Sequence, residues 1–400
     1  MRTDHRCTLS LAIATMLLLA LPASAQTQMW PNVIPYCPSA LSSMGAFTSC
    51  LYGLLEDDPV HLATNRYIAP GSGFLTAVAH GIKDFSDDEA KRQLTGEAAV
   101  SDRLFWQFKV SYELTPWRAE EREPLVSTVV YRRLAHLSFF GLGPDTPDRS
   151  FDFGAYELSI GVTKHKILTP AIRLDASIGY DQWSISDSSD PSSVKANFTE
   201  LTAPGINNQP RYLRYSAAFG FHLEPLLNIL TLTGKFFQDV SGKGASFFET
   251  DLAAQHSFHL GPSESATYGQ LSASLRLSFL DALHNPIPFY LRPTLGGADI
   301  NGQESLRGFQ DYRFRDNDAA VLQVEYDHAL LKDYLHGFVF ADAGQVAKSA
   351  GELFRFASLR HDVGLGLSLQ LQKQSWLRAY VAFGGGEGAQ TNLQFTMPTS

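Results

Sequence analysis

Cysteine is scarce in this chain, with three residues in a sequence of 400. Cys7 lies in an apolar N-terminal leader, which leaves Cys37 and Cys50 for the rest of the chain. Two cysteines in an exported chain favour one disulfide, Cys37–Cys50. It would close a loop of about 14 residues and contribute on the order of 3 kcal/mol. No His/Cys cluster surrounds the pair, so we expect no metal site, and we expect no cofactor.

Long apolar runs are also missing after the leader. No later segment approaches the ~18 apolar residues that a membrane-spanning helix needs. Residues 1–25 combine a basic start, MRTDHR, an apolar core, LSLAIATMLLLALP, and the small residues ASA before Gln26. This order predicts a secretory signal peptide. A membrane anchor is the alternative, which the shortness of the apolar run and Pro22 disfavour. Export without a membrane helix leaves the periplasm, secretion or an outer-membrane barrel.

Basic residues are outnumbered, with 32 Lys and Arg against 41 Asp and Glu and a net charge of −9. This balance argues against a nucleic-acid partner, which would require a basic face. The sequence also lacks a G-x-S-x-G elbow, a P-loop, an H-E-x-x-H motif and zinc-ligand spacing. We therefore expect no enzyme. A surface protease or lipase on the rim of a barrel is the alternative, but no Ser/His/Asp set stands out.

What the chain does contain is a recurring period of two. In HDVGLGLSLQLQKQ, which starts at His361, every second residue is apolar: Val363, Leu365, Leu367, Leu369 and Leu371. The same alternation occurs in WQFKVSYEL from Trp106, LRYSAAFGF from Leu213 and QLSASLRLSF from Gln270. Such a period places one residue set on each face of a β-strand. No comparable helical period covers the chain.

The two faces differ in a way that suits a membrane barrel. The polar faces carry charges such as Lys109 and Arg276, and the apolar faces carry aromatic residues near strand ends, such as Trp106. A soluble sandwich with one wet face is the alternative. Strands of about 10–12 residues exceed the usual length and suit a tilted membrane crossing. We predict an all-β fold: a single 16-stranded antiparallel transmembrane β-barrel over residues 72–400, in the outer membrane of a Gram-negative bacterium.

The predicted strands run from Gly73 to Met397, and Ile287–Pro293 is the eleventh of the sixteen. This count leaves one conflict, because it places the long polar loop Asp181–Arg211 on the periplasmic side, whereas long loops are expected outside. Residues 26–71 are predicted to form a short periplasmic N-terminal segment. It is either a flexible tether with one disulfide clip or a short helix that plugs or docks on the barrel.

The segment LGGADINGQESLRGFQDYRF, from Leu295, interrupts the strand pattern. It is rich in glycine and charge, yet it holds four large apolar residues: Leu306, Phe309, Tyr312 and Phe314. We therefore expect the loop Gly296–Asp318 to fold into the barrel lumen. Farther on, FVFADAGQV from Phe338 places an acid, Asp342, in the middle of a strand.

These segments resemble the BamA/TamA superfamily, also called the bacterial surface antigen family. Its long loop carries a tetrad, here Leu306, Arg307, Gly308 and Phe309, and a later strand carries F-x-D-x-G, here Phe340, Asp342 and Gly344. The preceding LGG (Leu295–Gly297), LQVEYDHAL and FFGLGPDTPD are also similar to the family. The resemblance is strongest from Ile287 to Phe383. It implies that the loop inserts into the barrel and that the arginine of the tetrad contacts the acid of the strand.

The chemistry of the two side chains agrees with this implied contact. A guanidinium offers a planar fork that a carboxylate can accept bidentately, and Gly308 lets the backbone turn closely. The alternative is that Arg307 is an exposed loop charge and Asp342 an independent lumen carboxylate. Two departures weaken the match. Residues 26–71 are too few for a periplasmic POTRA domain, and Gln390 replaces the glycine of the usual C-terminal assembly signal.

The resemblance implies a protein assembly or translocation factor. It would act by lateral opening of the seam between the first and last strands, with the Gly296–Asp318 loop locked in the lumen. The alternative is a plugged channel or a structural barrel without insertase activity. Expected partners are outer-membrane lipid and unfolded outer-membrane or secreted proteins, and the barrel is expected to be monomeric.

Overall fold

The structure is a computed structural model. It describes residues 60–64, 67–73, 75–87, 90–116, 123–186, 191–225, 227–261, 269–331, 334–355, 357–371 and 374–395. The predicted signal peptide over residues 1–25 and the predicted Cys37–Cys50 disulfide lie outside the described residues.

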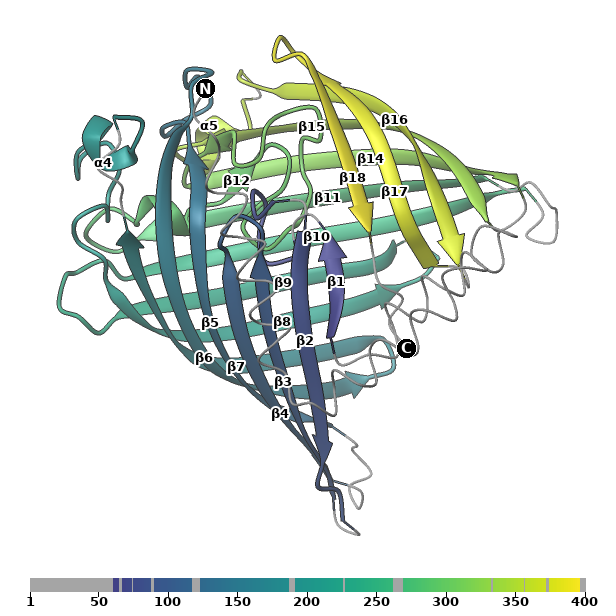
Figure 1. Ribbon diagram of the computed structural model, residues 1–400, viewed down its shortest axis with the longest axis horizontal. Helices are drawn as coiled ribbons and strands as arrows, with labels where there is room; N and C mark the ends of the chain where they lie inside the picture. Colours follow the sequence, from purple (N-terminus) through teal and green to yellow (C-terminus); the bar gives the residue numbers. More distant parts are fainter. Residues whose placement is uncertain are drawn as a thin grey trace, which may run out of the picture.

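Sixteen strands form one sheet in the described part of the chain, and each strand pairs antiparallel with its neighbours in sequence. They are β1 (Val60–Thr64), β2 (Leu75–Asp84), β3 (Ala90–Ser101), β4 (Trp106–Pro116), β5 (Leu125–Phe139), β6 (Phe151–Thr169), β7 (Ile172–Ser186), β8 (Arg211–Leu223), β9 (Leu227–Asp239), β10 (Phe247–Leu260), β11 (Gly269–Ala282), β14 (Asp318–Leu331), β15 (Leu335–Ala347), β16 (Arg360–Leu371), β17 (Gln374–Gly384) and β18 (Ala389–Phe395). The sheet curves into a barrel-like wall (Figure 1). The predicted all-β, 16-stranded antiparallel fold is confirmed.

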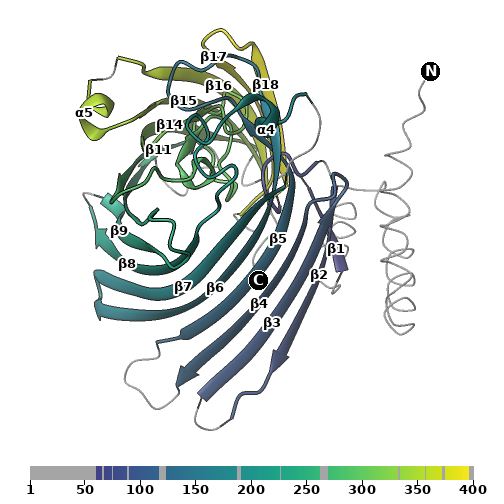
Figure 2. The ribbon, with the colours of Figure 1, turned by 90° about the vertical axis from the view of Figure 1, so that its left-hand side faces the viewer.

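The remaining elements are small. They are α4 (Val194–Asn197), η1 (Phe289–Leu291), α5 (Ala350–Leu353) and a two-stranded ribbon of β12 (Thr294–Leu295) and β13 (Phe314–Arg315). Among the described residues, no helix has the length and apolar character to cross a membrane. The segment between β11 and β14, residues 283–317, runs inside the curve of the sheet (Figure 2). We call this segment the lumen loop.

The alternation along β16 shows which face of the wall is apolar. Val363, Leu365 and Leu367 point outward with 54%, 56% and 51% of their surface exposed. The glycines between them face the lumen, where they leave room for aromatic rings. A Cβ on Gly364 would lie 2.3 Å from the Phe340 ring, and one on Gly366 would lie 2.4 Å from the Phe338 ring. The apolar face is therefore the outer one, as in a barrel whose outside contacts lipid.

Two errors in the predicted strand list cancel in the count. The sheet begins at β1, in residues assigned to the N-terminal segment that was predicted to end at 71, because a five-residue strand is too short to show a period of two. The predicted strand Ile287–Pro293 is instead a loop containing η1, since its two prolines cannot donate to a sheet ladder.

This correction resolves the conflict over the long polar loop. With β1 counted, the connection over residues 187–210 follows the seventh strand, β7. It therefore lies at the same end as the other long connections, which follow β5, β11 and β15. Short turns follow β6, β8 and β16 at the opposite end. Outer-membrane barrels have this asymmetry, with long loops outside and short turns in the periplasm.

An apolar cluster closes the lumen at the long-loop end. Phe289 of η1 is fully buried. Its ring packs at an angle against Phe139 of β5 and edge-to-face against Phe153 of β6, with centroids 4.8 Å and 4.9 Å apart. Phe198, just after α4, packs on Phe139 at 4.9 Å. The connection after β7 also contacts the lumen loop directly, since the Phe289 N–H donates to the carbonyl oxygen of Pro204 at 2.8 Å.

Candidate functional site

Within the lumen loop, the β12–β13 ribbon closes off residues 296–313, and glycine makes the turn after β12 possible. Gly296 and Gly297 both have left-handed backbone angles, with φ of +103° and +53°. A Cβ on Gly296 would lie 2.7 Å from the carbonyl oxygen of Gln310, and one on Gly297 would lie 2.8 Å from the Asp311 nitrogen. Side chains at these positions would push apart the two arms of the loop.

The apolar members of the tetrad anchor the loop to the wall. Leu306 is fully buried and Phe309 is 3% exposed. They pack in a cluster with residues of the ribbon, β14 and β15: Leu295, Phe314, Ala319, Val321 and Val346. Burial of two large apolar side chains contributes roughly 3–6 kcal/mol toward holding the loop in place. The loop is therefore packed as a protein core, not suspended in water.

Arg307 makes the central polar contact of the loop. Its Nε and Nη2 each donate to a different oxygen of the Asp342 carboxylate, at 2.8 Å in both cases. The backbone N–H of Arg307 also donates to Asp342 Oδ2, at 3.2 Å. Nη1 donates to Glu325 of β14 at 2.5 Å. The guanidinium lies 3.6 Å from the centroid of the Phe340 ring, a cation–π distance.

Both partners of this ion pair are withdrawn from water. The side chain of Arg307 is 5% exposed and that of Asp342 is 0% exposed. Burial lowers the pKa of Arg307, but the hydrogen bonds and negative charge of Asp342 and Glu325 raise it above its ordinary value on balance. A doubly hydrogen-bonded fork of this kind fixes orientation as well as position.

The glycines of both motifs face close neighbours. A Cβ on Gly308 would lie 2.6 Å from both Asp362 Cβ and the Gly384 backbone nitrogen, so this residue allows the loop to touch β16 and β17. The predicted close turn is present without a positive φ at Gly308, since the Phe309 N–H donates to the Leu306 carbonyl oxygen at 3.1 Å across Arg307 and Gly308. A Cβ on Gly344 would lie 2.7 Å from the carbonyl oxygen of Ala320 on β14.

The contacts extend to residues that the sequence did not single out. Glu325 is shared, since Arg378 of β17 also donates to it. The Arg378 guanidinium lies 3.9 Å from the Phe338 ring centroid. Asp362 of β16 is the direct cross-strand neighbour of Asp342 and is 1% exposed. The period of two could have placed Glu325 and Arg378 on the lumen face, but it could not have paired strands that are far apart in sequence.

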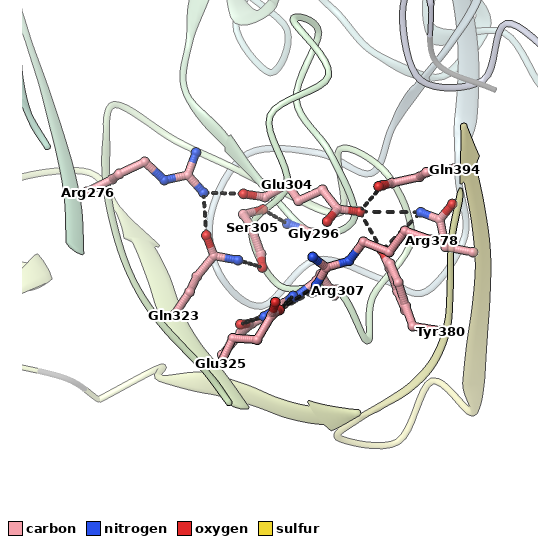
Figure 3. Close-up of polar contacts among 12 residues, drawn as sticks. Arg276, Gly296, Glu304, Ser305, Arg307, Gln323, Glu325, Arg378, Tyr380 and Gln394 are labelled. Atoms are coloured by element: carbon pink, nitrogen blue, oxygen red, sulfur yellow. Dashed lines mark hydrogen bonds and ion pairs between the residues drawn. The ribbon is translucent and has the colours of Figure 1, made fainter. Parts of the chain in front are cut away.

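A second polar group binds the loop to the last two strands. One carboxylate oxygen of Glu304, Oε1, accepts hydrogen bonds from Tyr380 at 2.5 Å, Gln394 at 2.6 Å and Asn392 at 3.4 Å. On the opposite side, Arg276 of β11 donates to the Glu304 carbonyl oxygen. Figure 3 shows these contacts with the Arg307 group beside them.

The loop thus reaches close to the place where the sheet ends. β1 and β18 lie in contact, but among the described residues no hydrogen-bonded ladder joins them. They are also the two shortest strands of the sheet, with five and seven residues. The junction of β1 and β18, called the seam below, is the weakest join in the described wall. In the described part of the chain, no group of three or more metal-ligating side chains comes together.

Comparisons with known proteins agree with this architecture. No family model matches the chain, and no curated protein matches its sequence. Among solved structures, BamA from Haemophilus ducreyi, in a form lacking POTRA domains 1–3, is similar with a TM-score of 0.55 and 13% identity, over 84% of this chain and 69% of that one. CdiB from Acinetobacter baumannii gives a TM-score of 0.48 and 12% identity, over 84% and 58%. The first likeness bears on fold alone: the chain has a BamA-like β-barrel fold.

Proposed function

We propose that the chain is an outer-membrane assembly or translocation factor that works by lateral opening at the seam. Its partners would be membrane lipid and unfolded outer-membrane or secreted proteins. The unfolded proteins would pair with the separated edges of β1 and β18 or pass between them. A single barrel would suffice, and the proposed activity is not enzymatic. The outer membrane of a Gram-negative bacterium would be its location.

The observation that supports this proposal most is the contrast between the seam and the rest of the wall. Every other neighbouring pair of strands is joined by an antiparallel ladder, whereas β1 and β18 are not joined by one among the described residues. An unpaired strand edge offers N–H and C=O groups that another chain can bind. A wall with one such edge can accept an incoming strand there.

The lumen loop would keep the remaining wall in shape while the seam opens. Arg307 ties it to β14 and β15 through Glu325 and Asp342. Ordered packing and a bidentate ion pair on one side of the lumen would leave the separation of β1 from β18 as the easiest motion. In this proposal the loop holds the strands of the wall in position and takes part in no chemical reaction.

Reconstitution into liposomes tests the proposal. An unfolded barrel protein would be added, and its protection from protease would be followed over time with and without this protein in the bilayer. We expect faster protection with the wild type and loss of the acceleration in Arg307→Ala. Arg173→Ala, an arginine of β7 whose side chain is 62% exposed, is the matched control. The same rate in empty vesicles as with correctly folded protein would refute a self-sufficient insertase.

A plugged channel is the second candidate. Two cavities of about 580 Å³ and 610 Å³ lie in the lumen and share Arg276 and Gln303 in their linings. Charged lumen side chains such as Lys235 and Glu249, paired at 2.8 Å, are compatible with a watery interior. A channel blocked by the loop predicts a small conductance in planar bilayers that rises sharply when residues 302–316 are deleted. Unchanged conductance in a folded deletion variant would exclude it.

A further inference from the structure

Two consecutive residues of the lumen loop contact opposite sides of the seam. Tyr312 is 3% exposed, and its hydroxyl donates to the carbonyl oxygen of Pro70 at 3.1 Å. Pro70 lies in the connection between β1 and β2, next to Ile68 and Ala69, which are buried in the same apolar cluster as Tyr312. The tyrosine therefore binds the first pair of strands at the long-loop end.

Arg313 binds the last pair of strands. Its Nε donates to Glu387, in the turn between β17 and β18, and the two side chains are 6% and 9% exposed. The same guanidinium donates to Thr146 between β5 and β6, to Oγ1 at 2.7 Å and to the carbonyl oxygen at 3.0 Å. It also lies 4.9 Å from the Phe140 ring centroid. All three of its nitrogens thus have partners in the described part of the chain.

The backbone is held so that these two side chains diverge. Tyr312 has a left-handed φ of +62°, which costs free energy for a residue with a bulky side chain. Its N–H donates to the carbonyl oxygen of Gly296 at 3.1 Å, which fixes the turn against the start of the loop. A conformation of this kind persists only where surrounding contacts maintain it. At Tyr312, this conformation allows one short segment to contact both sides of the seam.

We propose that Tyr312 and Arg313 form a clasp that closes the seam at the long-loop end, and that opening requires the Arg313–Glu387 pair to separate. The inference rests on the proposed function in that it concerns the same seam. It differs from the Arg307 contact, which joins the loop to β14 and β15 and not to β1–β2 or β17–β18. Since no described ladder joins β1 to β18, the clasp would supply the closing interaction that backbone pairing does not.

Distance measurement between spin labels tests the clasp without any insertion assay. The three native cysteines would be replaced by serine, and labels would be placed at Ala77 in β2 and Phe383 in β17. Both positions lie near the long-loop ends of strands next to the seam, and Phe383 is 50% exposed. The variants would be Arg313→Gln and the charge swap R313E/E387R. Arg292→Gln is the matched control, because Arg292 pairs with Asp316 at 3.5 Å and its side chain is 8% exposed.

We expect Arg313→Gln to raise the share of wide separations by about tenfold, because it leaves the Glu387 carboxylate without its partner charge. The charge swap should restore much of the narrow distribution, and Arg292→Gln should leave it unchanged. Heat-modified migration in gels checks that each variant is folded. A folded Arg313→Gln with the wild-type distribution would overturn the clasp, as would equal widening in the Arg292 control.

These outcomes separate the clasp from the proposed function. Widening in Arg313→Gln together with an inactive wild type in the liposome assay would support the clasp and refute the insertase. A wild type that is active in the liposome assay, together with unchanged label distances in Arg313→Gln, would support the insertase and refute the clasp.

Discussion

The side-chain amide of Gln394, in the last strand, donates a hydrogen bond of 2.6 Å to the carboxylate of Glu304 in the lumen loop. The same oxygen accepts from Tyr380 at 2.5 Å, so one loop side chain binds both β17 and β18. Hydrogen bonds to a charged acceptor are stronger than neutral ones. The C-terminal edge of the wall is therefore attached to the lumen loop at mid-strand as well as at the clasp.

Glu304→Ala should lower the stability of the barrel by about 2–4 kcal/mol, because three donors lose a charged acceptor and are only partly rehydrated. The midpoint of heat-induced band shift in gels, or of urea unfolding in lipid, would measure the loss. Glu113→Ala, which removes an acid whose side chain is 32% exposed, is the control. Equal midpoints for the two variants would show that the Glu304 contacts contribute nothing specific.

Arg307→Ala should cost about 3–5 kcal/mol, since it leaves the buried Asp342 without a partner charge. Arg307→Lys should recover only part of this stability, because an ammonium cannot donate bidentately to Asp342 and stack on Phe340 as the guanidinium does. The double variant R307A/D342A should be more stable than R307A alone. Urea midpoints of the wild type, R307A, D342A and the double variant give the coupling energy between the two side chains, and strict additivity would contradict the contact.

Gly308→Ala should destabilise the loop by about 1–3 kcal/mol through overpacking. The new methyl would meet Asp362 Cβ and the Gly384 nitrogen, and neither the strand backbone nor a Cβ can move away cheaply. Gly385→Ala is the matched control, because a Cβ there meets nothing within 4 Å. Protease sensitivity of the lumen loop would measure the effect. Loss of protease resistance in both variants, or in neither, would contradict the close approach of Gly308 to β16 and β17.

The stability of the loop should also depend on Asp316, which lies just before β14. Burial raises the pKa of its carboxyl, with Glu352 adding to the rise, while the Asn317 N–H, Arg292 and Lys348 oppose it. The folded state thus holds this proton at higher pH than the unfolded state does. Stability from this group is therefore greatest at low pH and falls as pH rises through the raised pKa.

Asp316→Asn removes that titration. Relative to the wild type, the variant should gain stability between pH 4 and pH 8, because the wild-type carboxyl loses its proton as pH rises through its raised pKa and the amide does not titrate. Unfolding midpoints of both proteins across this range would measure the difference. A difference that does not change with pH, or that favours the variant more at pH 4, would contradict the assignment.

Much of the fold followed from the sequence because a membrane barrel repeats one simple pattern. The alternation in β16 and β11 is long enough to be seen in a single strand, and so most of the strands and the inward loop were predictable. The count of sixteen was right because one missed strand and one wrongly assigned strand cancelled. β1 was missed because five residues hold little periodic signal. Ile287–Pro293 was wrongly assigned because its apolar residues serve the buried cap around Phe289, not a strand.

The candidate site was also predictable only in part. Arg307 and Asp342 could be paired from a family resemblance, and the structure places them 2.8 Å apart. Glu304, Arg313 and Glu387 could not be assigned partners, because their contacts depend on how deeply the loop enters and which turns it meets. Their only sequence signal is a charge in a glycine-rich segment, which is also what an exposed loop would show.

The glycines that face the lumen along β16 reverse the usual expectation about which residues of a strand tolerate change. Leu365 and Leu367 face outward, where another apolar residue of similar size would serve as well. Gly364 and Gly366 lie against Phe340 and Phe338 and leave no room for even a methyl group. Along this strand, natural substitutions should therefore be frequent at the outward leucines and rare at the glycines. The glycines, not the leucines, limit which sequences this strand can have.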